Sequence, residues 1–261
     1  MLKKDKIRSR LGEERTNNFG SKMVIKEYRN SKDIDVYFPQ YNWMTKNKEY
    51  QNFKRGNIKC PYEPRIYGVG FIGEGKYKTK ENGKHTKEYD IYHDMLKRCY
   101  DPKTQDKYPT YKGCTVEEYL LNFQHMAEWI ENNYYEIPGE IMCLDKDILY
   151  KGNKTYCRDK CIFVPERINN LFTKSDKSRG KNPIGVTLTS SGNYRAQCWD
   201  GNGRYNYLGT YSIKEEAFRI YKQYKEKVIK EVIDSYKGII PEPHYSRLKE
   251  AMYNYEVEID D

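Results

Sequence analysis

Three short segments near the C-terminal end of the chain are rich in branched and aromatic residues and are separated by glycine-containing turns. They cover residues 184–189, 194–199 and 205–210, and the turns contain Ser191-Gly192 and residues 200–203. Segments of this length, joined in this way, are typical of consecutive β-hairpins. The spacing therefore predicts a three-stranded antiparallel sheet.

A helix is predicted directly after the third segment. Ser212 is the expected N-cap, and Glu215 stands where a capping-box partner belongs. Apolar residues then recur at helical spacing, at Ile213, Ala217, Ile220, Tyr221, Tyr224 and Val228. Such a stripe covers one face of a neighbouring sheet, so we expect the other face to stay open.

The whole chain is predicted to have an α+β fold in three segments. Residues 1–75 are expected to form a small N-terminal β module with a basic arm, containing strands at 23–28 and 34–38. Residues 76–175 are expected to form a central domain, and residues 176–261 to form the three-stranded sheet packed on one helix, with a C-terminal tail.

The central segment begins with two predicted helices. The first carries Tyr89, Tyr92, Leu96 and Cys99 on one face and ends near Asp101-Pro102. The second is expected to start at Thr115, whose hydroxyl would cap it. Strand-like runs at 141–144 and 161–165 follow, with a helix after the second run.

Charge and cysteine content limit the classes of protein. The chain has 47 Lys and Arg against 38 Asp and Glu, a net charge of +9 that suits a polyanionic partner. No apolar run approaches the ~20 residues needed to cross a bilayer, so we expect no membrane partner and a cytoplasmic location. The seven cysteines argue against a disulfide framework, and Cys157 and Cys161 are interpreted as reduced thiols.

The C-terminal segment resembles the DNA-binding domain of plant ethylene-response factors, also found in phage and mobile-element nucleases. The resemblance covers about fifty residues and is carried by Gly185-Val186, the run 192–197, Leu208-Gly209-Thr210-Tyr211 and Glu215–Phe218. In that family the open sheet face enters the major groove of double-stranded DNA. The first predicted strand departs from the family, because it has Thr187 and Thr189 where further arginines are usual.

The resemblance implies a set of DNA-binding residues. Arg195, Gln197 and Trp199 alternate along the middle strand and therefore share one face. Arg204 and Tyr205 adjoin them, and Lys181 is expected to contact the DNA backbone. The alternative is that these residues only coat a solvated sheet.

The central segment is similar to phage HNH-type homing endonucleases. The motifs are Tyr92 to Tyr100, Tyr108 to Val116, Leu144-Asp145-Lys146-Asp147 and Asn169-Asn170, in that order. In that family a ββα fold holds one divalent cation, expected to be Mg²⁺, against the scissile phosphate. The resemblance implies Asp145 as the first metal ligand and Asn169 or Asn170 as the second.

The position of the catalytic base departs from the family, because Lys146 stands where histidine is usual. A lysine can act as a base only if its charged form is strongly disfavoured; otherwise Lys146 is expected to bind phosphate. Asp145 and Asp147 have a second interpretation as turn caps.

Three functions follow as hypotheses. The first is a metal-dependent DNA endonuclease of phage or mobile-element origin. The second is a DNA-binding regulator that has lost cleavage, and the third is a phage anti-defence protein that inhibits a host protein in the bacterial cytoplasm. All three fit a basic chain, and the first two require double-stranded DNA as partner.

Overall fold

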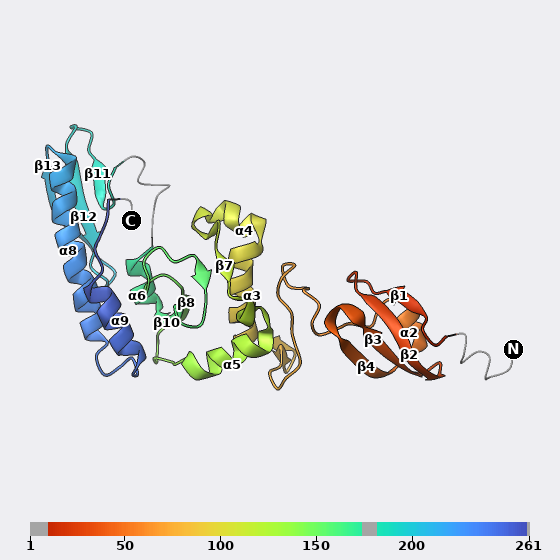
Figure 1. The fold of residues 1–261 in the computed structure, drawn as a ribbon. Helices are drawn as coiled ribbons and strands as arrows, with labels where there is room; N and C mark the ends of the chain where they lie inside the picture. Colours follow the sequence, from red (N-terminus) through yellow and green to blue (C-terminus); the bar gives the residue numbers. More distant parts are fainter. Residues whose placement is uncertain (1–9, 174–181, 260–261) are drawn as a thin grey trace. The chain divides into compact units, whose positions relative to one another are not determined.

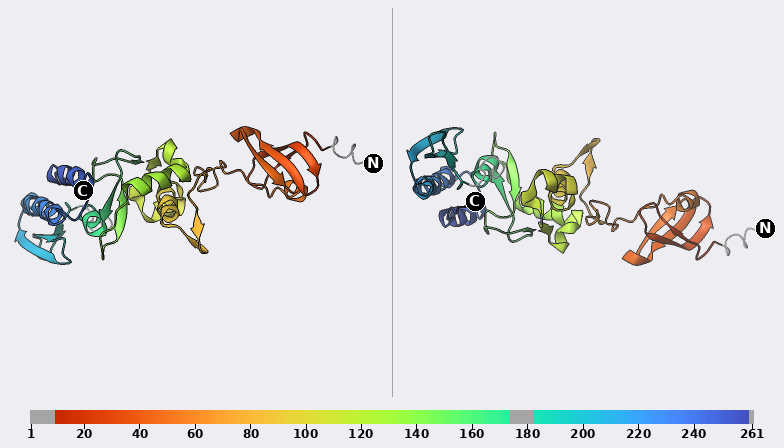
Figure 2. Two further views of the ribbon diagram at one scale, coloured as in Figure 1. Left: turned by 90° about the horizontal axis from the view of Figure 1, so that it is seen from below. Right: turned by 90° about the horizontal axis from the view of Figure 1, so that it is seen from above.

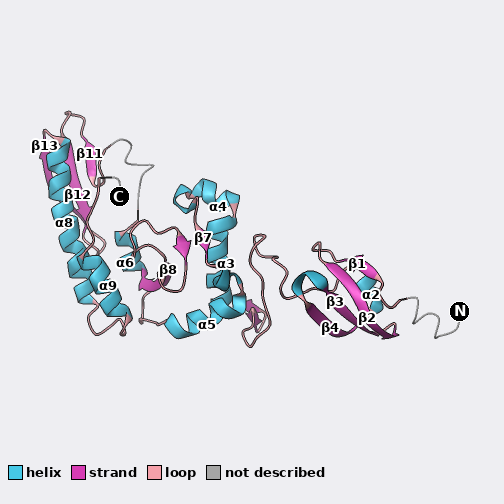
Figure 3. Ribbon diagram, in the orientation of Figure 1, coloured by secondary structure: helices cyan, strands magenta, loops and turns pink. Residues whose placement is uncertain are grey.

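The computed structural model describes residues 10–173 and 182–259 of the chain, and it has an α+β fold (Figures 1 and 3). The described residues belong to two compact units, Met1–Glu131 and Asn132–Asp261. Most of the expected basic arm, at Lys3, Lys4, Lys6 and Arg8, lies outside the described residues. Within the described ranges, no helix combines the length and apolar character needed to span a membrane.

The first unit begins with a four-stranded antiparallel meander in the order β1-β2-β3-β4, which confirms the predicted β module. Its strands are β1 (Glu14–Thr16), β2 (Lys22–Asn30), β3 (Asp33–Phe38) and β4 (Trp43–Lys48), followed by helix α2 (Tyr50–Lys54). Branched and aromatic residues from β2, β3 and α2, among them Ile25, Ile34 and Phe53, form the core of the meander.

The rest of the first unit is mainly helical. Helix α3 (Lys87–Tyr100) ends before Asp101 as predicted, and its N-cap Thr86 accepts a hydrogen bond from the Tyr89 amide at 3.3 Å. The other elements are η1 (Pro39–Tyr41), which lies between β3 and β4, and β5 (Lys80–Glu81), β6 (Lys84–His85), α4 (Pro102–Lys107), η2 (Pro109–Tyr111), β7 (Thr115–Val116), η3 (Glu118–Leu121) and α5 (Phe123–Asn133). The last two residues of α5 belong to the second unit.

The helix predicted to start at Thr115 is wrong at its beginning. Thr115 lies in the short strand β7, and α5 begins only at Phe123. The side chain of Asn122 accepts a hydrogen bond from the Gln124 amide at 3.0 Å, so the start of α5 is satisfied locally by Asn122. Phe123, Ala127 and Ile130 are buried on one side of α5.

The second unit opens with two strands and a helix. Strand β8 (Met142–Asp145) pairs antiparallel with β10 (Ile162–Pro165), and α6 (Glu166–Leu171) follows at once. The short strand β9 (Thr155–Tyr156) lies in the connection between them. Asp145 is therefore the last residue of its strand, opposite Ile162.

The predicted three-stranded sheet is confirmed, with antiparallel order β11-β12-β13. Its strands are β11 (Val186–Leu188), β12 (Tyr194–Trp199) and β13 (Tyr205–Tyr211). Helix α8 (Lys214–Ser235) runs along one face of the sheet (Figure 2), where Ala196 and Ala217 are both fully buried. Its N-cap is Ile213 and no side chain caps it, so the predicted Ser212 cap is wrong.

A second C-terminal helix, α9 (His244–Tyr253), lies where a tail was expected. It buries Tyr245, Leu248 and Met252, and Lys249 Nζ contacts Asp234 Oδ1 on α8 at 3.0 Å. The spacing of these three buried residues is helical and was the signal overlooked in the sequence. The helix α9 therefore extends the packed part of the unit beyond α8.

One hydrophobic core joins the strand–strand–helix segment to the sheet and its helix. Val164 and Ile168 belong to the same cluster as Val228 and Leu248. Arg167 on α6 also donates from Nε to the Gly201 carbonyl at 2.6 Å, in the turn between β12 and β13. The boundary expected near residue 175 thus falls inside a single compact unit.

Glycine at position 209 is expected to be required for the shape of β13. Its φ is +126°, and an added Cβ would lie 2.6 Å from the Tyr211 hydroxyl. We expect Gly209→Ala to lower the free energy of unfolding by about 2–3 kcal/mol, through backbone strain together with this contact.

The matched control is Gly192→Ala, which changes a positive-φ glycine with no atom within 4 Å of the added Cβ. It should cost about 1 kcal/mol, because only the backbone is strained. Urea unfolding of both variants measures the difference, and equal losses would contradict the role given to the Tyr211 contact.

Candidate nucleic-acid interface

The sheet face that α8 leaves uncovered is built from cross-strand neighbours on three strands. Arg195 on β12 lies opposite Thr187 on β11 and Thr210 on β13. Gln197 lies opposite Tyr207, and Trp199 lies opposite Tyr205. Residues directly opposite one another in a ladder share a face of the sheet. We call these eight residues the open face; they are Thr187, Arg195, Gln197, Trp199, Tyr205, Tyr207, Thr210 and the rim residue Arg204.

Side chains along β12 alternate between buried and more exposed, as expected for a strand with one covered face. Ala196 and Cys198 are 0% and 2% exposed beneath the sheet. Arg195 is exposed and Gln197 and Trp199 are half-buried. Tyr205 and Tyr207 are 74% and 65% exposed, which is high for large aromatic side chains. The open face therefore offers the Arg195 guanidinium, and that of Arg204 at its rim, among amide, hydroxyl and aromatic groups.

A β-bulge in β13 places Tyr207 and Thr210 on the same face although they are three residues apart. The pairing with β12 shifts between Ala196 and Gln197, so β13 carries one extra residue, Leu208, at this point. The Tyr207 and Thr210 hydroxyls then lie 2.9 Å apart. Sequence alternation alone does not predict this neighbourhood, and both residues were missed as members of the open face.

Arg204 is held at the rim of the open face by the turn before β13. The Asp200 carboxylate accepts hydrogen bonds from the amides of Asn202 at 2.7 Å and Arg204 at 3.1 Å. These backbone hydrogen bonds lower the pKa of Asp200. The Arg204 side chain is exposed, as is Tyr205 beside it. Lys181, the remaining predicted DNA contact, lies outside the described residues.

The second predicted site surrounds Asp145 at the end of β8. Its Oδ1 accepts hydrogen bonds from the amides of Asp147 at 2.8 Å and Ile148 at 2.7 Å. The carboxylate thus caps the turn that follows the strand. Burial and the nearby charge of Asp147 raise the pKa of Asp145 to about 6, although the two backbone hydrogen bonds act in the opposite direction.

Lys146 is buried, with 6% of its surface exposed. Its Nζ contacts Asp147 Oδ2 at 2.9 Å, and its carbonyl accepts a hydrogen bond from Asn153 Nδ2 at 2.7 Å. On α6, Asn169 is half-buried and Asn170 is exposed. Asn170 lines a cavity together with Gln197 and Trp199 of the sheet. The structure thus connects Asn170 with the open face.

The donor set at the end of β8 does not fit a divalent cation well. Mg²⁺ prefers several oxygen ligands in octahedral geometry. Here one oxygen of Asp145 already accepts two amide hydrogen bonds, and Asp147 is engaged by the Lys146 ammonium. Among the residues that the structure describes, no three His, Cys, Asp or Glu side chains are grouped to hold a metal. We therefore derive no metal-dependent step here.

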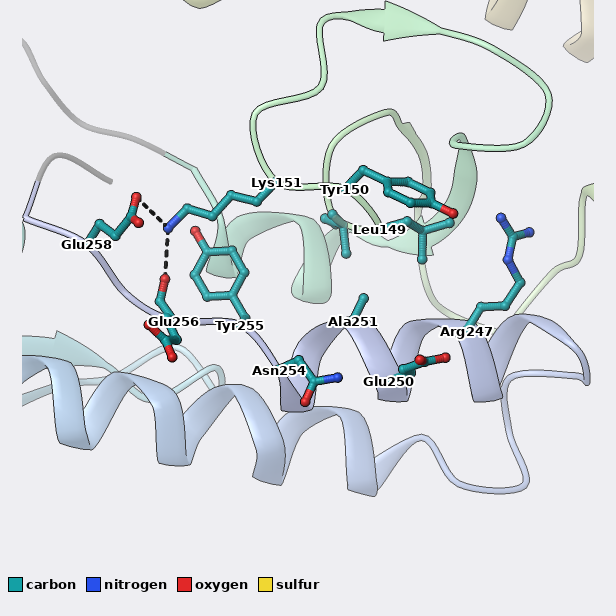
Figure 4. Close-up of a pocket in the computed structure, with 11 residues that line it drawn as sticks. Leu149, Tyr150, Lys151, Arg247, Glu250, Ala251, Asn254, Tyr255, Glu256 and Glu258 are labelled. Atoms are coloured by element: carbon teal, nitrogen blue, oxygen red, sulfur yellow. Dashed lines mark hydrogen bonds and ion pairs between the residues drawn. The ribbon is translucent and has the colours of Figure 1, made fainter.

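The second unit also contains free thiols and a further pocket. Cys157 and Cys161 are free thiols, and burial raises the pKa of Cys161. A pocket between the β8–β10 connection and α9 contains Lys151 and Arg247 (Figure 4). Lys151 Nζ bonds to the Glu256 carbonyl at 2.8 Å, and Arg247 donates to the Asp159 carbonyl at 2.6 Å. Both cations of this pocket thus already contact protein oxygens.

Replacing Asp145 by asparagine separates its turn-capping role from its charge. Asn keeps an oxygen that can accept the two amide hydrogen bonds but carries no charge. A carboxyl with a raised pKa in the folded state favours folding at low pH and loses that advantage as pH rises through about 6. We therefore expect Asp145→Asn to be more stable than wild type at pH 8, on the order of 1 kcal/mol.

This gain should vanish near pH 4, where the wild-type carboxyl is protonated in the folded protein. Asp145→Ala is the matched control, because it removes the acceptor as well as the charge and should be less stable than Asp145→Asn at both pH values. Thermal unfolding across this pH range is the measurement. A stability difference that does not change with pH would refute the raised pKa.

Comparison with known proteins adds no family assignment. No protein-family model matches the chain, and searches among curated proteins and solved structures find no significant match. Membership of either family named above therefore stays a prediction that rests on the motifs in the sequence.

Proposed function

We propose that this protein binds double-stranded DNA through the open face of the β11–β13 sheet. The observation that carries the proposal is the asymmetry of the sheet. One face is buried under α8, whereas the other presents Arg195 among exposed aromatic and polar side chains. Aromatic side chains that are exposed together beside an arginine are typical of a binding surface.

Arg195 has the best position for reading bases. It lies on the central strand, with Thr187 on one side and Thr210 on the other, neither of which is bulky. A major groove about 12 Å wide admits two neighbouring β-strands, and an arginine on such a strand can donate two hydrogen bonds to guanine. Gln197, two residues along the same strand, has the amide that pairs with adenine.

The aromatic residues and Arg204 suit a different task. Trp199 and Tyr205 lie opposite each other at the end of the sheet beside the turn that holds Arg204. Hydroxyl, indole N–H and guanidinium groups commonly donate to phosphate oxygens, which positions a protein on DNA without reading its sequence. The net charge of +9 supports the same partner.

DNA cleavage is the second candidate function, favoured by the order β8, β10 and α6 with Asp145 at a strand end. Asp145 and Lys146 are the candidate catalytic residues, with Mg²⁺ held by Asp145 and by Asn169 or Asn170. The poor fit of the donor set described above weighs against this function. A DNA-binding protein without cleavage is therefore our main proposal.

Substitution of Arg195 tests whether this residue reads a base. We expect Arg195→Ala to weaken binding to a preferred duplex by about 1–3 kcal/mol more than it weakens binding to random DNA. The preferred duplex is first obtained by selection from a random library with the wild-type protein. Fluorescence anisotropy at several salt concentrations then measures both affinities.

Arg219→Ala is the matched control, because Arg219 is an exposed arginine on α8, outside the open face. It removes the same charge and should weaken both duplexes slightly and equally. If wild-type affinity does not fall as salt rises, the DNA-binding proposal fails. If Arg195→Ala loses the same affinity for both duplexes, the open face binds DNA without reading its bases.

Cleavage of DNA can be tested separately from binding. We expect wild-type protein to bind duplex DNA both in Mg²⁺ and in EDTA, and to leave supercoiled plasmid intact in both. Gel analysis of plasmid over several hours is the measurement. Nicking that requires Mg²⁺ and disappears in Asp145→Ala, while duplex binding persists, would overturn this expectation and establish the nuclease.

A further inference from the structure

A cavity of about 620 Å³ opens beside the β11 edge of the sheet. Part of its lining belongs to the open face, namely Thr187, Gln197, Trp199 and Tyr205. Another part comes from the end of α6, and the inner wall includes Lys225 of α8. The cavity is therefore continuous with the surface proposed to bind DNA.

Lys225 is an unusual residue for its position in α8. It is 7% exposed and lies four residues after Tyr221 and three before Val228, within the buried stripe of the helix. Among the described residues, its ammonium takes part in no hydrogen bond or ion pair. Burial lowers the pKa of Lys225, and within the described part of the chain the Cys198 thiol acts on this pKa in the opposite direction.

Lys225 also lines the cavity, and an ammonium that is only partly hydrated and has no counter-charge is in an unfavourable position. The neighbouring positions of the stripe are filled by Val228, Ile229 and Val232, so an apolar side chain would be the ordinary occupant. An anion in the cavity would compensate the charge of Lys225. The wall also provides side-chain donors for such an anion, in the amides of Asn170 and Gln197 and the hydroxyl of Thr187.

Close packing forms the wall next to Lys225. Gly185 has a φ of +73°, and an added Cβ would lie 2.0 Å from the ring of Tyr221. The chain thus passes directly over Tyr221 on its way into β11, and both residues line the cavity. The cavity is bounded here by rigid groups rather than by long exposed side chains.

We propose that this cavity binds a phosphate group, with Lys225 as its cation and with Thr187, Gln197 and Asn170 as hydrogen-bond donors. Two sources share this chemistry. One is a backbone phosphate of DNA seated on the open face, a source that rests on the proposed function. The other is a free nucleotide, whose base can stack on Trp199 or Tyr205 at the cavity mouth.

The test uses the full chain and the variant Lys225→Met, which replaces the ammonium by an apolar group of similar length. Lys227→Met is the matched control, because Lys227 is exposed on the same helix and carries the same charge. Inorganic phosphate and deoxyadenosine monophosphate are titrated by calorimetry and by following the indole N–H resonance of Trp199. Duplex DNA is titrated by anisotropy as a function of salt.

We expect both phosphate compounds to bind wild type and Lys227→Met and to lose at least tenfold in affinity with Lys225→Met. If DNA supplies the phosphate, Lys225→Met also lowers duplex affinity and reduces the salt dependence by about one phosphate contact. If a free nucleotide is the source, duplex binding by Lys225→Met equals that of Lys227→Met. If nucleotide binding depends on Lys225 but the wild-type protein does not bind duplex DNA, the cavity proposal stands and only the proposed function is rejected.

Equal binding of phosphate, nucleotide and duplex by wild type and Lys225→Met would overturn the cavity proposal. Thr187→Val provides a second test that leaves the core untouched, because Thr187 is exposed on the edge strand β11. It should weaken binding of both phosphate compounds several-fold without changing thermal stability. Unchanged binding by Thr187→Val together with a misfolded Lys225→Met would also count against the proposal.

Discussion

The close packing of α8 on the three-stranded sheet is the contact on which the second unit depends. It is possible because Ala196 on β12 and Ala217 on α8 are both small and fully buried. Because α8 buries one face of the sheet at these small residues, the polar and aromatic side chains of the open face lie on the other face. The same helix also supports α9 and part of α6 through the shared core, so one helix organises both candidate sites of this unit.

Much of the fold follows from local signals in the sequence. Strand β12 was predicted at its observed bounds, since glycine turns mark both of its ends. The sequence-based predictions were wrong about where helices begin, and they missed a helix that depends on packing. Neither Ser212 nor Thr115 caps a helix, because the chain is still extended at Ile213 and still in strand β7 at Thr115. Helix α9 was missed because a short helix gains its stability from contacts with α8 rather than from local propensity.

Some residues of the candidate sites could likewise be predicted from the sequence, and others could not. Arg195 and its neighbours on β12 follow from a period of two, which any regular strand obeys. Tyr207 and Thr210 do not, since the bulge resets the alternation in β13. Lys225 had a signal in the sequence, a lysine in the middle of an apolar stripe, but its lack of a partner depends on what the sheet and α6 bring close to it. Such information exists only in three dimensions.

Arg167 gives the second unit a mechanical property. Its guanidinium bonds to Gly201 and Asn202 in the β12–β13 turn and to Ser235 at the end of α8, so it fastens one hairpin to two helices. These contacts limit how far the hairpin can turn relative to α6, which follows β10 directly in the chain. A ligand bound to the sheet would therefore keep a similar orientation relative to α6 in every bound molecule.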